Sequence, residues 1–283
     1  MINRSAAGLI GALLWLAASP CARGDVAVTD DSSEAQIMGF YAAAIAFTPN
    51  GSPAGPKYEA GLEAVYLPSL SGEDRETTFA GAKIQNTNFT QVMPRPRLRW
   101  RPAEGWLLEA GFFPEAQVFG VTPRQYGLAA SWRAARIEGR LGFWVRGHYL
   151  DADIEGPITC PEEAVEDSTN SVCFGGEVSA DRFRPETYGV DLVLEGPRLL
   201  ADGLAWYAAA GWMHQTLRFE THFVNVFGRL DDQRLVARLD RASLLGGITW
   251  VERHGLRLTF EGSYVPDALA TARLGITWGW GGP

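Results

Sequence analysis

Long stretches of the chain alternate apolar and polar side chains with a period of two. In residues 58–66, for instance, tyrosine, alanine and leucine alternate with Glu59, Gly61 and Glu63. The pattern recurs in 125–133, 137–149, 187–195, 256–264 and 271–280. This period is typical of β-strands that have one apolar and one polar face. It predicts an all-β protein, and beyond the N-terminus no run reaches the roughly 18 apolar residues that a transmembrane helix needs.

Tryptophans lie beside predicted turns at one end of these strands. They are Trp100, Trp106, Trp132, Trp206, Trp250 and Trp280. If successive strands run up and down, all of them lie at one level. A ring of this kind is typical of membrane barrels, because the indole body packs on acyl chains while its N–H reaches water. The connections at this end are short, whereas those at the other end include 151–181 and 224–232, as in barrels with short inner turns and long outer loops.

Residues 1–24 have the pattern of a signal peptide. Arg4 supplies the positive start, 6–18 form a short apolar stretch, and cleavage is predicted after Gly24. A lipoprotein signal with the lipid on Cys21 is the alternative interpretation. In either case the chain is predicted to be exported.

Removal of the leader leaves Cys160 and Cys173 as the cysteines of the mature chain. Both lie in a polar segment, and export permits their oxidation, so a disulfide between them is predicted. A bridge that closes a loop of this size stabilises a chain by about 3 kcal/mol, which is enough to hold a surface loop in shape. The surrounding segment, 151–181, is acidic but lacks a regular spacing of ligands for a divalent cation, so no metal site is predicted.

Together these features resemble Gram-negative outer-membrane β-barrel proteins as a generic, porin-like class. The resemblance rests on the leader, the alternating strands, the aromatic girdle and a last strand, 272–280, that ends in Trp280. It implies that residues 25–283 form one closed, antiparallel, up-and-down transmembrane barrel in the cell outer membrane. It also implies contacts with outer-membrane lipid and lipopolysaccharide, and recognition of the last strand by the barrel assembly machinery. Gly281–Pro283 follow the aromatic residue that usually ends such a strand.

The resemblance further implies that both chain termini lie in the periplasm, so that the number of strands is even. Twelve strands are predicted, at 37–48, 57–67, 75–84, 89–101, 106–119, 123–133, 137–150, 184–195, 203–222, 233–250, 256–265 and 270–280. The first and third have a second interpretation. Residues 33–36 fit a capping box, and the alanine-rich stretch to Phe47 then fits a helix docked in the lumen. If 75–84 is also a loop, ten strands remain.

The polar faces of the strands predict the lining of the lumen. In 94–101 proline, leucine and tryptophan alternate with arginine, so that the arginines form a ladder on the inner face. The predicted lumen residues are Glu59, Glu63, Arg95, Arg97, Arg99, Glu109, Glu138, Arg140 and Arg146. Two interpretations stay open: a salt-bridged interior that fills and stiffens the barrel, or a basic constriction that selects anionic solutes.

Pro94 and Pro96 lie two residues apart in the same predicted strand. Each lacks a backbone N–H, and both missing donors would face the same neighbouring strand. One seam of the barrel is therefore predicted to be weak, which would suit lateral release of an apolar solute into the membrane. The alternative places both prolines near the outer rim, where water or a loop satisfies the partner carbonyls.

These observations predict an outer-membrane channel or transporter for small solutes with an Arg/Glu-lined lumen. The alternative is a non-conducting structural or adhesive barrel with a disulfide-held external loop. The net charge of -8 excludes a basic face for nucleic acid. The chain also lacks a Gly-x-Ser-x-Gly motif, a His-x-Ser motif and a paired-histidine spacing, so no enzyme, catalytic residue or cofactor is predicted.

Overall fold

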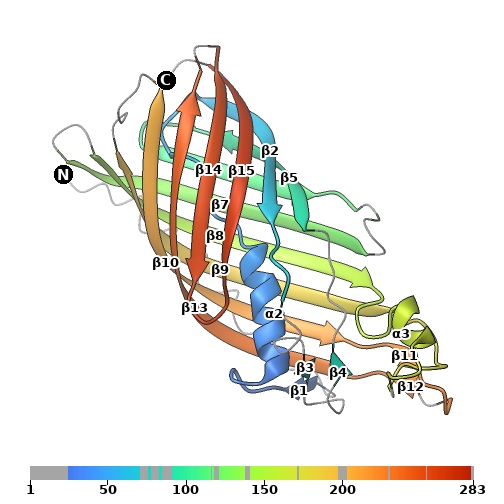
Figure 1. Cartoon of the computed structure of the whole chain (residues 1–283). Coiled ribbons are helices and arrows are strands. Elements are labelled where there is room, and N and C mark those ends of the chain that lie inside the picture. Colours follow the sequence, from blue (N-terminus) through green and yellow to red (C-terminus); the bar gives the residue numbers. More distant parts are fainter. Residues whose placement is uncertain are drawn as a thin grey trace.

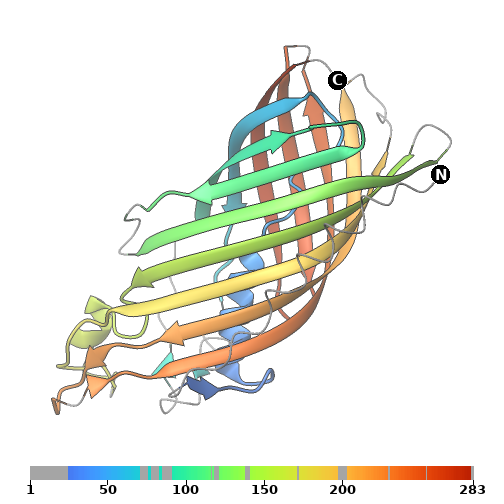
Figure 2. The ribbon, with the colours of Figure 1, turned by 180° about the vertical axis from the view of Figure 1, so that it is seen from behind.

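Ten strands close into an antiparallel barrel (Figure 1). The computed structural model describes residues 25–70, 76–77, 83–84, 91–115, 117, 121–137, 141–170, 172–196, 203–228, 230–252 and 254–281. The order around the barrel is β13 (Arg234–Val251), β10 (Leu204–Glu220), β9 (Asp181–Gly196), β8 (Leu141–Gly156), β7 (Thr122–Ile137), β6 (Trp106–Phe113), β5 (Val92–Trp100), β2 (Tyr58–Tyr66), β15 (Leu269–Trp280) and β14 (Leu256–Val265). Pairing of β13 with β14 closes the ring. Figure 2 shows the long, tilted strands on the opposite side.

The outer face of the barrel is apolar and the inner face is polar. Leu98, Leu128 and Leu274 point outward and expose 53%, 55% and 60% of their surface, respectively. Arg95 and Glu63, in contrast, are fully buried inside. Hydrocarbon solvates such an exterior, and closure of the sheet pairs the backbone groups of neighbouring strands with each other, as a membrane-spanning structure requires. The protein is therefore an outer-membrane β-barrel.

The predicted girdle tryptophans gather at one end of the barrel, where the short turns lie. Trp100, Trp106, Trp132, Trp250 and Trp280 are exposed and Trp206 is partly buried. The register explains their common level: Trp106 pairs with Trp132, and Tyr58 pairs with Trp100 on one side and Trp280 on the other. We call this the short-turn end, and we call the opposite end, which carries the long connections, the loop end.

The prediction of twelve strands was wrong, and the alternative of ten is correct. Residues 37–48 are not a strand, because Ser33–Ala44 form the helix α2. Its N-cap is Ser32, one residue before the predicted capping box, and the Ser32 side chain accepts a hydrogen bond from the N–H of Ala35 at 3.1 Å. A helix enclosed by a barrel is apolar on all sides, so its sequence lacks the one-sided pattern that would distinguish it from a strand.

The predicted strand at 75–84 is also absent from the wall. Its described residues form two short strands, β3 (Glu76–Thr77) and β4 (Lys83–Ile84), which pair only with each other near the loop end (Figure 1). A two-residue strand is far shorter than the nine to eleven or so residues that cross a bilayer.

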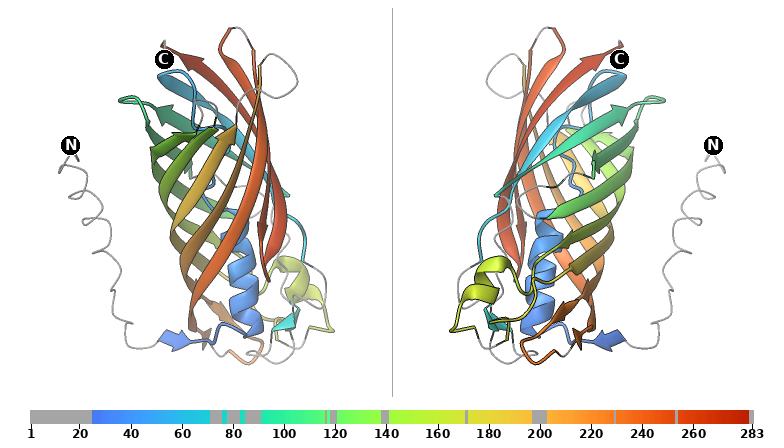
Figure 3. Two further views of the ribbon diagram at one scale, coloured as in Figure 1. Left: turned by 90° about the vertical axis from the view of Figure 1, so that its left-hand side faces the viewer. Right: turned by 90° about the vertical axis from the view of Figure 1, so that its right-hand side faces the viewer.

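The N-terminal segment threads the barrel. The strand β1 (Asp25–Ala27) pairs in parallel with β13 at Arg234–Val236, outside the ring and at the loop end. From there α2 enters the lumen, and the chain continues to the short-turn end, where β2 begins (Figure 3). Asp25, the first residue that the structure describes, therefore lies at the opposite end from Trp280. With the predicted cleavage after Gly24, the two termini would not share one side. The even strand number still holds, because β2 starts where β15 ends.

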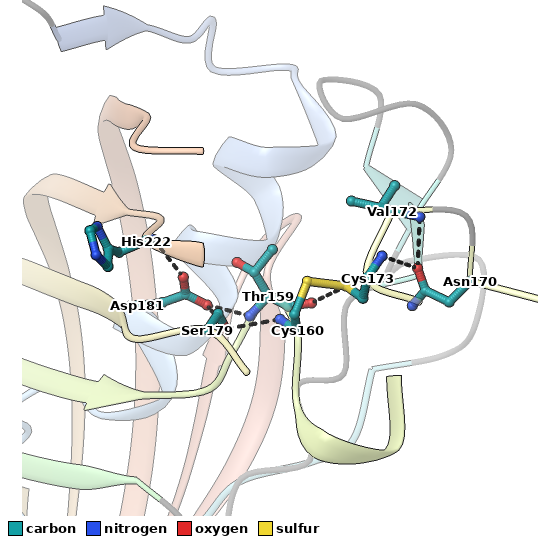
Figure 4. The surroundings of a disulfide bond; sticks show 8 residues. All are labelled: Thr159, Cys160, Asn170, Val172, Cys173, Ser179, Asp181 and His222. Carbon is teal, nitrogen blue, oxygen red and sulfur yellow. Dashed lines mark hydrogen bonds between the residues drawn. A yellow bond between two sulfur atoms is a disulfide. The ribbon is translucent and has the colours of Figure 1, made fainter. Parts of the chain in front are cut away.

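A disulfide organises the loop end. Cys160 and Cys173 are bonded, with 5.5 Å between their Cα atoms, beside the short helix α3 (Glu162–Glu166). The carboxylate of Asp181 accepts hydrogen bonds from the backbone N–H groups of Thr159 and His222, and thereby joins two connections (Figure 4). The second connection also carries the two-residue strands β11 (Phe223–Val224) and β12 (Leu230–Asp231). Neither described helix is long and apolar enough to cross a membrane.

Candidate functional site

A plug from the protein's own N-terminal region occupies the lumen. We define the plug as residues 33–56, which comprise α2 and an extended tail, 45–56. The helix lies in the half of the lumen nearer the loop end, where the wall contributes apolar side chains: Leu150, Phe183, Leu217, Leu235, Leu239 and Val265. The tail lies in the half nearer the short-turn end, among charged side chains, and is buried as far as Pro53. The lumen thus has an apolar tier and a charged tier.

The arginine ladder of β5 binds carboxylates of the neighbouring strands. Glu63 of β2 lies 2.7 Å from Arg95 and 2.8 Å from Arg97, measured between oxygen and nitrogen. Glu109 of β6 lies 3.1 Å from Arg97, 3.2 Å from Arg99 and 2.9 Å from Arg146. These pairs follow from the sheet register, which sets Arg95 opposite Glu63 and Arg99 opposite Glu109.

The same arginines hold the backbone of the plug tail. Arg95 donates to the carbonyl oxygen of Ile45 at 3.0 Å, and Arg97 donates to that of Thr48 at 2.7 Å. Farther along the tail, the guanidinium of Arg101 donates to the carbonyl of Pro53 at 2.8 Å. Arginines farther along β5 therefore bind carbonyls farther along the tail.

The opposite wall binds the N–H groups of the tail. Glu261 accepts from the N–H of Asn50 at 2.9 Å, and the Tyr207 hydroxyl accepts from that of Gly51 at 2.9 Å. The carboxylate of Glu195 accepts from the N–H of Ala54 at 3.0 Å. The tail lies between a wall of donors and a wall of acceptors, which satisfies the polar backbone that its burial would otherwise leave without partners.

Most of the predicted lumen residues belong to this network. Glu59, Glu63, Arg95, Arg97, Arg99, Glu109 and Arg146 all face inward and are buried. Glu138 and Arg140 lie outside the described residues. Two arginines of the last strands were not among the predicted lumen residues, although their strand parity was visible: Arg257 binds Glu59, and Arg273 lies 3.1 Å from Glu261. Sequence reasoning also did not anticipate that the tail itself supplies half of the hydrogen bonds of the ladder.

The seam between β5 and β6 is the shortest pairing in the ring. It runs only from Arg97 opposite Gly111 to Trp100 opposite Leu108, whereas β5 pairs with β2 along its whole length. The N–H of Arg101 donates to the carbonyl of Lys57, which precedes β2. Because the N–H groups of a strand point alternately to its two neighbours, the odd-numbered residues of β5 direct their N–H groups to β2 and the even-numbered residues direct theirs to β6. Pro94 and Pro96 therefore both face β6, and the pairing described between the two strands stops next to Pro96. Behind this gap lie Arg95, which is bound to Glu63, and the apolar side chains of Met93 and Phe113.

In the described part of the chain, no group of three or more histidine, cysteine, aspartate or glutamate side chains is arranged to hold a metal ion. His148 is buried and its Nε2 lies 3.7 Å from Asp191, in a cavity of about 10 Å³ that also touches Phe47 and Ser243. A space of this size accommodates one water molecule.

Comparison with known proteins yields structural likeness only. No family model matches the sequence, and no curated protein matches it. Among solved structures, the Pseudomonas putida toluene transporter TodX is 11% identical, with 80% of this chain and 89% of that chain covered and a TM-score of 0.30. The siderophore receptor PiuA from Acinetobacter baumannii is 14% identical, with 74% and 30% covered and a TM-score of 0.33. A loop-deletion mutant of OmpT from Vibrio cholerae is 11% identical, with 78% and 75% covered and a TM-score of 0.23. Similarity at this level carries no inference about function.

Proposed function

We propose that the protein is an outer-membrane channel for small, largely apolar solutes, which opens when its plug moves and releases the solute through the seam between β5 and β6. The observation that carries this proposal is the position of the gap beside Pro94 and Pro96. It adjoins the apolar tier, which the helix of the plug fills together with residues 45–47 of the tail. A solute that replaced the helix there would reach the membrane by passing the unpaired part of this seam, beside Arg95 and Met93.

The geometry gives less support to an anion-selective water pore. Such a pore requires guanidinium groups that are free to meet passing ions. Arg95, Arg97 and Arg99 are each bound both to carboxylates and to carbonyls of the tail. We infer that the main role of the arginine ladder is to hold the plug, and that selection of anionic solutes is a lesser role.

The alternative function is a non-conducting barrel with a structural or adhesive role. The occupied lumen and the disulfide-held connection at the loop end favour it. The two functions differ in one requirement, because a channel needs the plug to move and a structural barrel does not.

A reversible crosslink between plug and wall tests this requirement. A Cβ built on Gly127 would lie 3.2 Å from the Cβ of Phe47. A disulfide needs about 3.5–4.5 Å between these atoms, so a shift of a few tenths of an ångström would allow the bond. We expect the pair Phe47→Cys with Gly127→Cys to stop uptake of a lipophilic naphthylamine dye into intact cells when oxidised, and to restore it when reduced. Phe47→Cys alone, under both conditions, controls for loss of the ring and for reduction of the native disulfide. Equal uptake by the oxidised and reduced pair would favour the structural barrel.

A further inference from the structure

The aromatic ring of Phe47 sits in a depression of the barrel wall. Phe47 is fully buried, and its ring lies over Gly111 of β6 and Gly127 of β7, which are register partners. A Cβ added at either glycine would lie 2.7 Å from ring atoms, far inside normal contact. Any other residue at these two positions would therefore fill the space that the ring uses. The two facing glycines form a seat that fits a planar ring.

Three guanidinium groups surround this seat. The central carbons of Arg97, Arg95 and Arg146 lie 4.3, 5.0 and 5.4 Å from the centroid of the Phe47 ring. Cations within about 6 Å of an aromatic face are attracted by its electrons. The seat thus combines a flat apolar floor with three cationic side chains.

Some donors of the guanidinium groups at the seat have no acceptor in the wall. Arg95 and Arg97 donate to the carbonyls of Ile45 and Thr48, which flank Phe47 on the plug. In addition, the Nε of Arg97 and the Nη2 of Arg146 are buried and make no hydrogen bond within the described structure. If the tail left, the donors that now bind its carbonyls would also lose their acceptors, at a cost that an incoming oxygen would remove.

The type of hydrogen bond favours an anion over a neutral acceptor. At the seat, Arg95, Arg97 and Arg146 face three carboxylates, those of Glu63, Glu109 and Asp191, so the wall itself is balanced in charge. The donors that now bind the tail carbonyls are the ones that a ligand would take over. Guanidinium binds a carboxylate more strongly than a peptide carbonyl, because the hydrogen bonds are then assisted by charge.

We propose that this seat is a binding site for a planar aromatic ring that carries a carboxylate, and that Phe47 and its flanking carbonyls occupy it in the closed state. The ring of the ligand takes the place of the Phe47 ring on Gly111 and Gly127, and its carboxylate takes the place of the tail carbonyls at Arg95 and Arg97. This inference rests on the proposed function, since the tail must leave before a solute can enter the seat.

The first test removes the ring from the full chain and supplies it in solution. We expect Phe47→Ala to lower the midpoint of heat unfolding by several degrees, and millimolar benzoate to restore most of that loss. Phe40→Ala is the matched control, because Phe40 is buried in the apolar tier and belongs to the helix; benzoate is expected to leave its midpoint unchanged. Phe47→Leu, which keeps apolar bulk but not the planar ring, replaces the alanine variant if that variant does not fold.

Comparison of ligands tests the carboxylate. Benzoate should restore the Phe47→Ala variant at a concentration at least several-fold lower than benzene does, and Arg97→Lys in the same background should abolish that advantage because lysine lacks the two-pronged geometry. If benzene and benzoate restore the midpoint at the same concentration, the assignment of an anion is wrong. If neither compound restores the midpoint, the proposed seat is wrong.

The last test is made on a chain in which Phe47 is unchanged. We expect benzoate to increase several-fold the rate at which a maleimide labels Ala46→Cys, in a chain that retains Phe47, because displaced tail residues become accessible. An unchanged rate would overturn the proposal.

The labelling assay measures binding and not transport. A barrel that responds to benzoate but moves no solute refutes only the channel, and a barrel that moves solute but ignores benzoate refutes only the seat.

Discussion

Arg97 donates through Nη2 to the backbone oxygen of Thr48 at 2.7 Å, while its Nη1 lies 2.8 Å from Glu63. A single side chain thus connects the wall of the barrel to the plug. Because it binds a carbonyl, the contact depends on the path of the plug backbone and not on its side chains. The ladder therefore constrains where the tail runs, and this explains how an irregular, buried segment keeps its hydrogen bonds in a membrane protein.

Replacing Arg97 with alanine should destabilise the barrel strongly. The substitution leaves Glu63 and Glu109 with fewer cations in a buried site, and loss of one partner of a buried pair costs about 3–5 kcal/mol. Arg124→Ala is the matched control, because Arg124 is more than half exposed and lies 3.2 Å from Asp153, in a pair of the kind worth about 0–1 kcal/mol. The free energy of unfolding of both variants is measured by urea unfolding in lipid vesicles, with tryptophan fluorescence as the signal. Equal effects would show that the ladder is not a buried network.

Replacing Pro94 and Pro96 with valine should strengthen the seam. Both positions face β6, so the new N–H groups can extend the pairing beyond Arg97. Two added backbone hydrogen bonds correspond to about 1–3 kcal/mol. We expect a higher midpoint of heat unfolding together with slower dye uptake. Pro102→Val, in a short turn, is the control and should change neither the midpoint nor the uptake. If the double valine variant takes up dye at the parent rate, the solute does not leave through this seam.

The period-two pattern was sufficient to predict the wall of the barrel and the inward direction of its charges, because lipid imposes one strict rule on every strand. The pattern could not show what fills the lumen. Residues 37–48 were ambiguous, since a helix with apolar neighbours on all sides has no polar face to reveal its period. The partners of Arg95 and Arg97 include carbonyls of the tail, and backbone groups leave no trace in side-chain patterns. The sequence places Phe47 at the end of either a predicted strand or a predicted lumen helix, and only the two glycines that it contacts in the structure reveal where its ring lies.

Residues 25–30 should be accessible from outside the cell. Asp25–Ala27 pair with β13 at the loop end, and the chain reaches the short-turn end only after passing through the lumen. An epitope inserted after Asp30, in an exposed turn, is therefore expected to bind antibody on intact cells. The same epitope after Ala103, in a short turn, should bind only after the outer membrane is permeabilised. Binding at Ala103 but not at Asp30 on intact cells would reverse the orientation.

Loss of the disulfide should loosen the loop end without unfolding the barrel. Cys160 and Cys173 are separated by 13 positions, and a loop of that size gains about 3 kcal/mol from closure. In a variant with both cysteines replaced by serine, a glutamate-specific protease should cut rapidly at the exposed Glu162 and Glu163, while the midpoint of barrel unfolding stays near that of the parent. A barrel that no longer assembles would show that the bridge has a larger role.

A wedge between plug and wall should favour the open state. The helix α2 approaches β13 closely at Gly39, where an added Cβ would lie 2.5 Å from a methyl group of Leu239. Leucine at position 39 cannot fit unless the helix moves away from the wall, and overpacking of this kind costs about 1–3 kcal/mol. Because this cost applies only while the plug is in place, Gly39→Leu should raise dye uptake several-fold and leave assembly of the barrel unchanged. Gly147→Leu provides the control, since a Cβ at Gly147 meets nothing within 4 Å and leucine there adds bulk without a clash. If Gly39→Leu lowers stability but leaves uptake at the level of the control, the plug does not act as a gate.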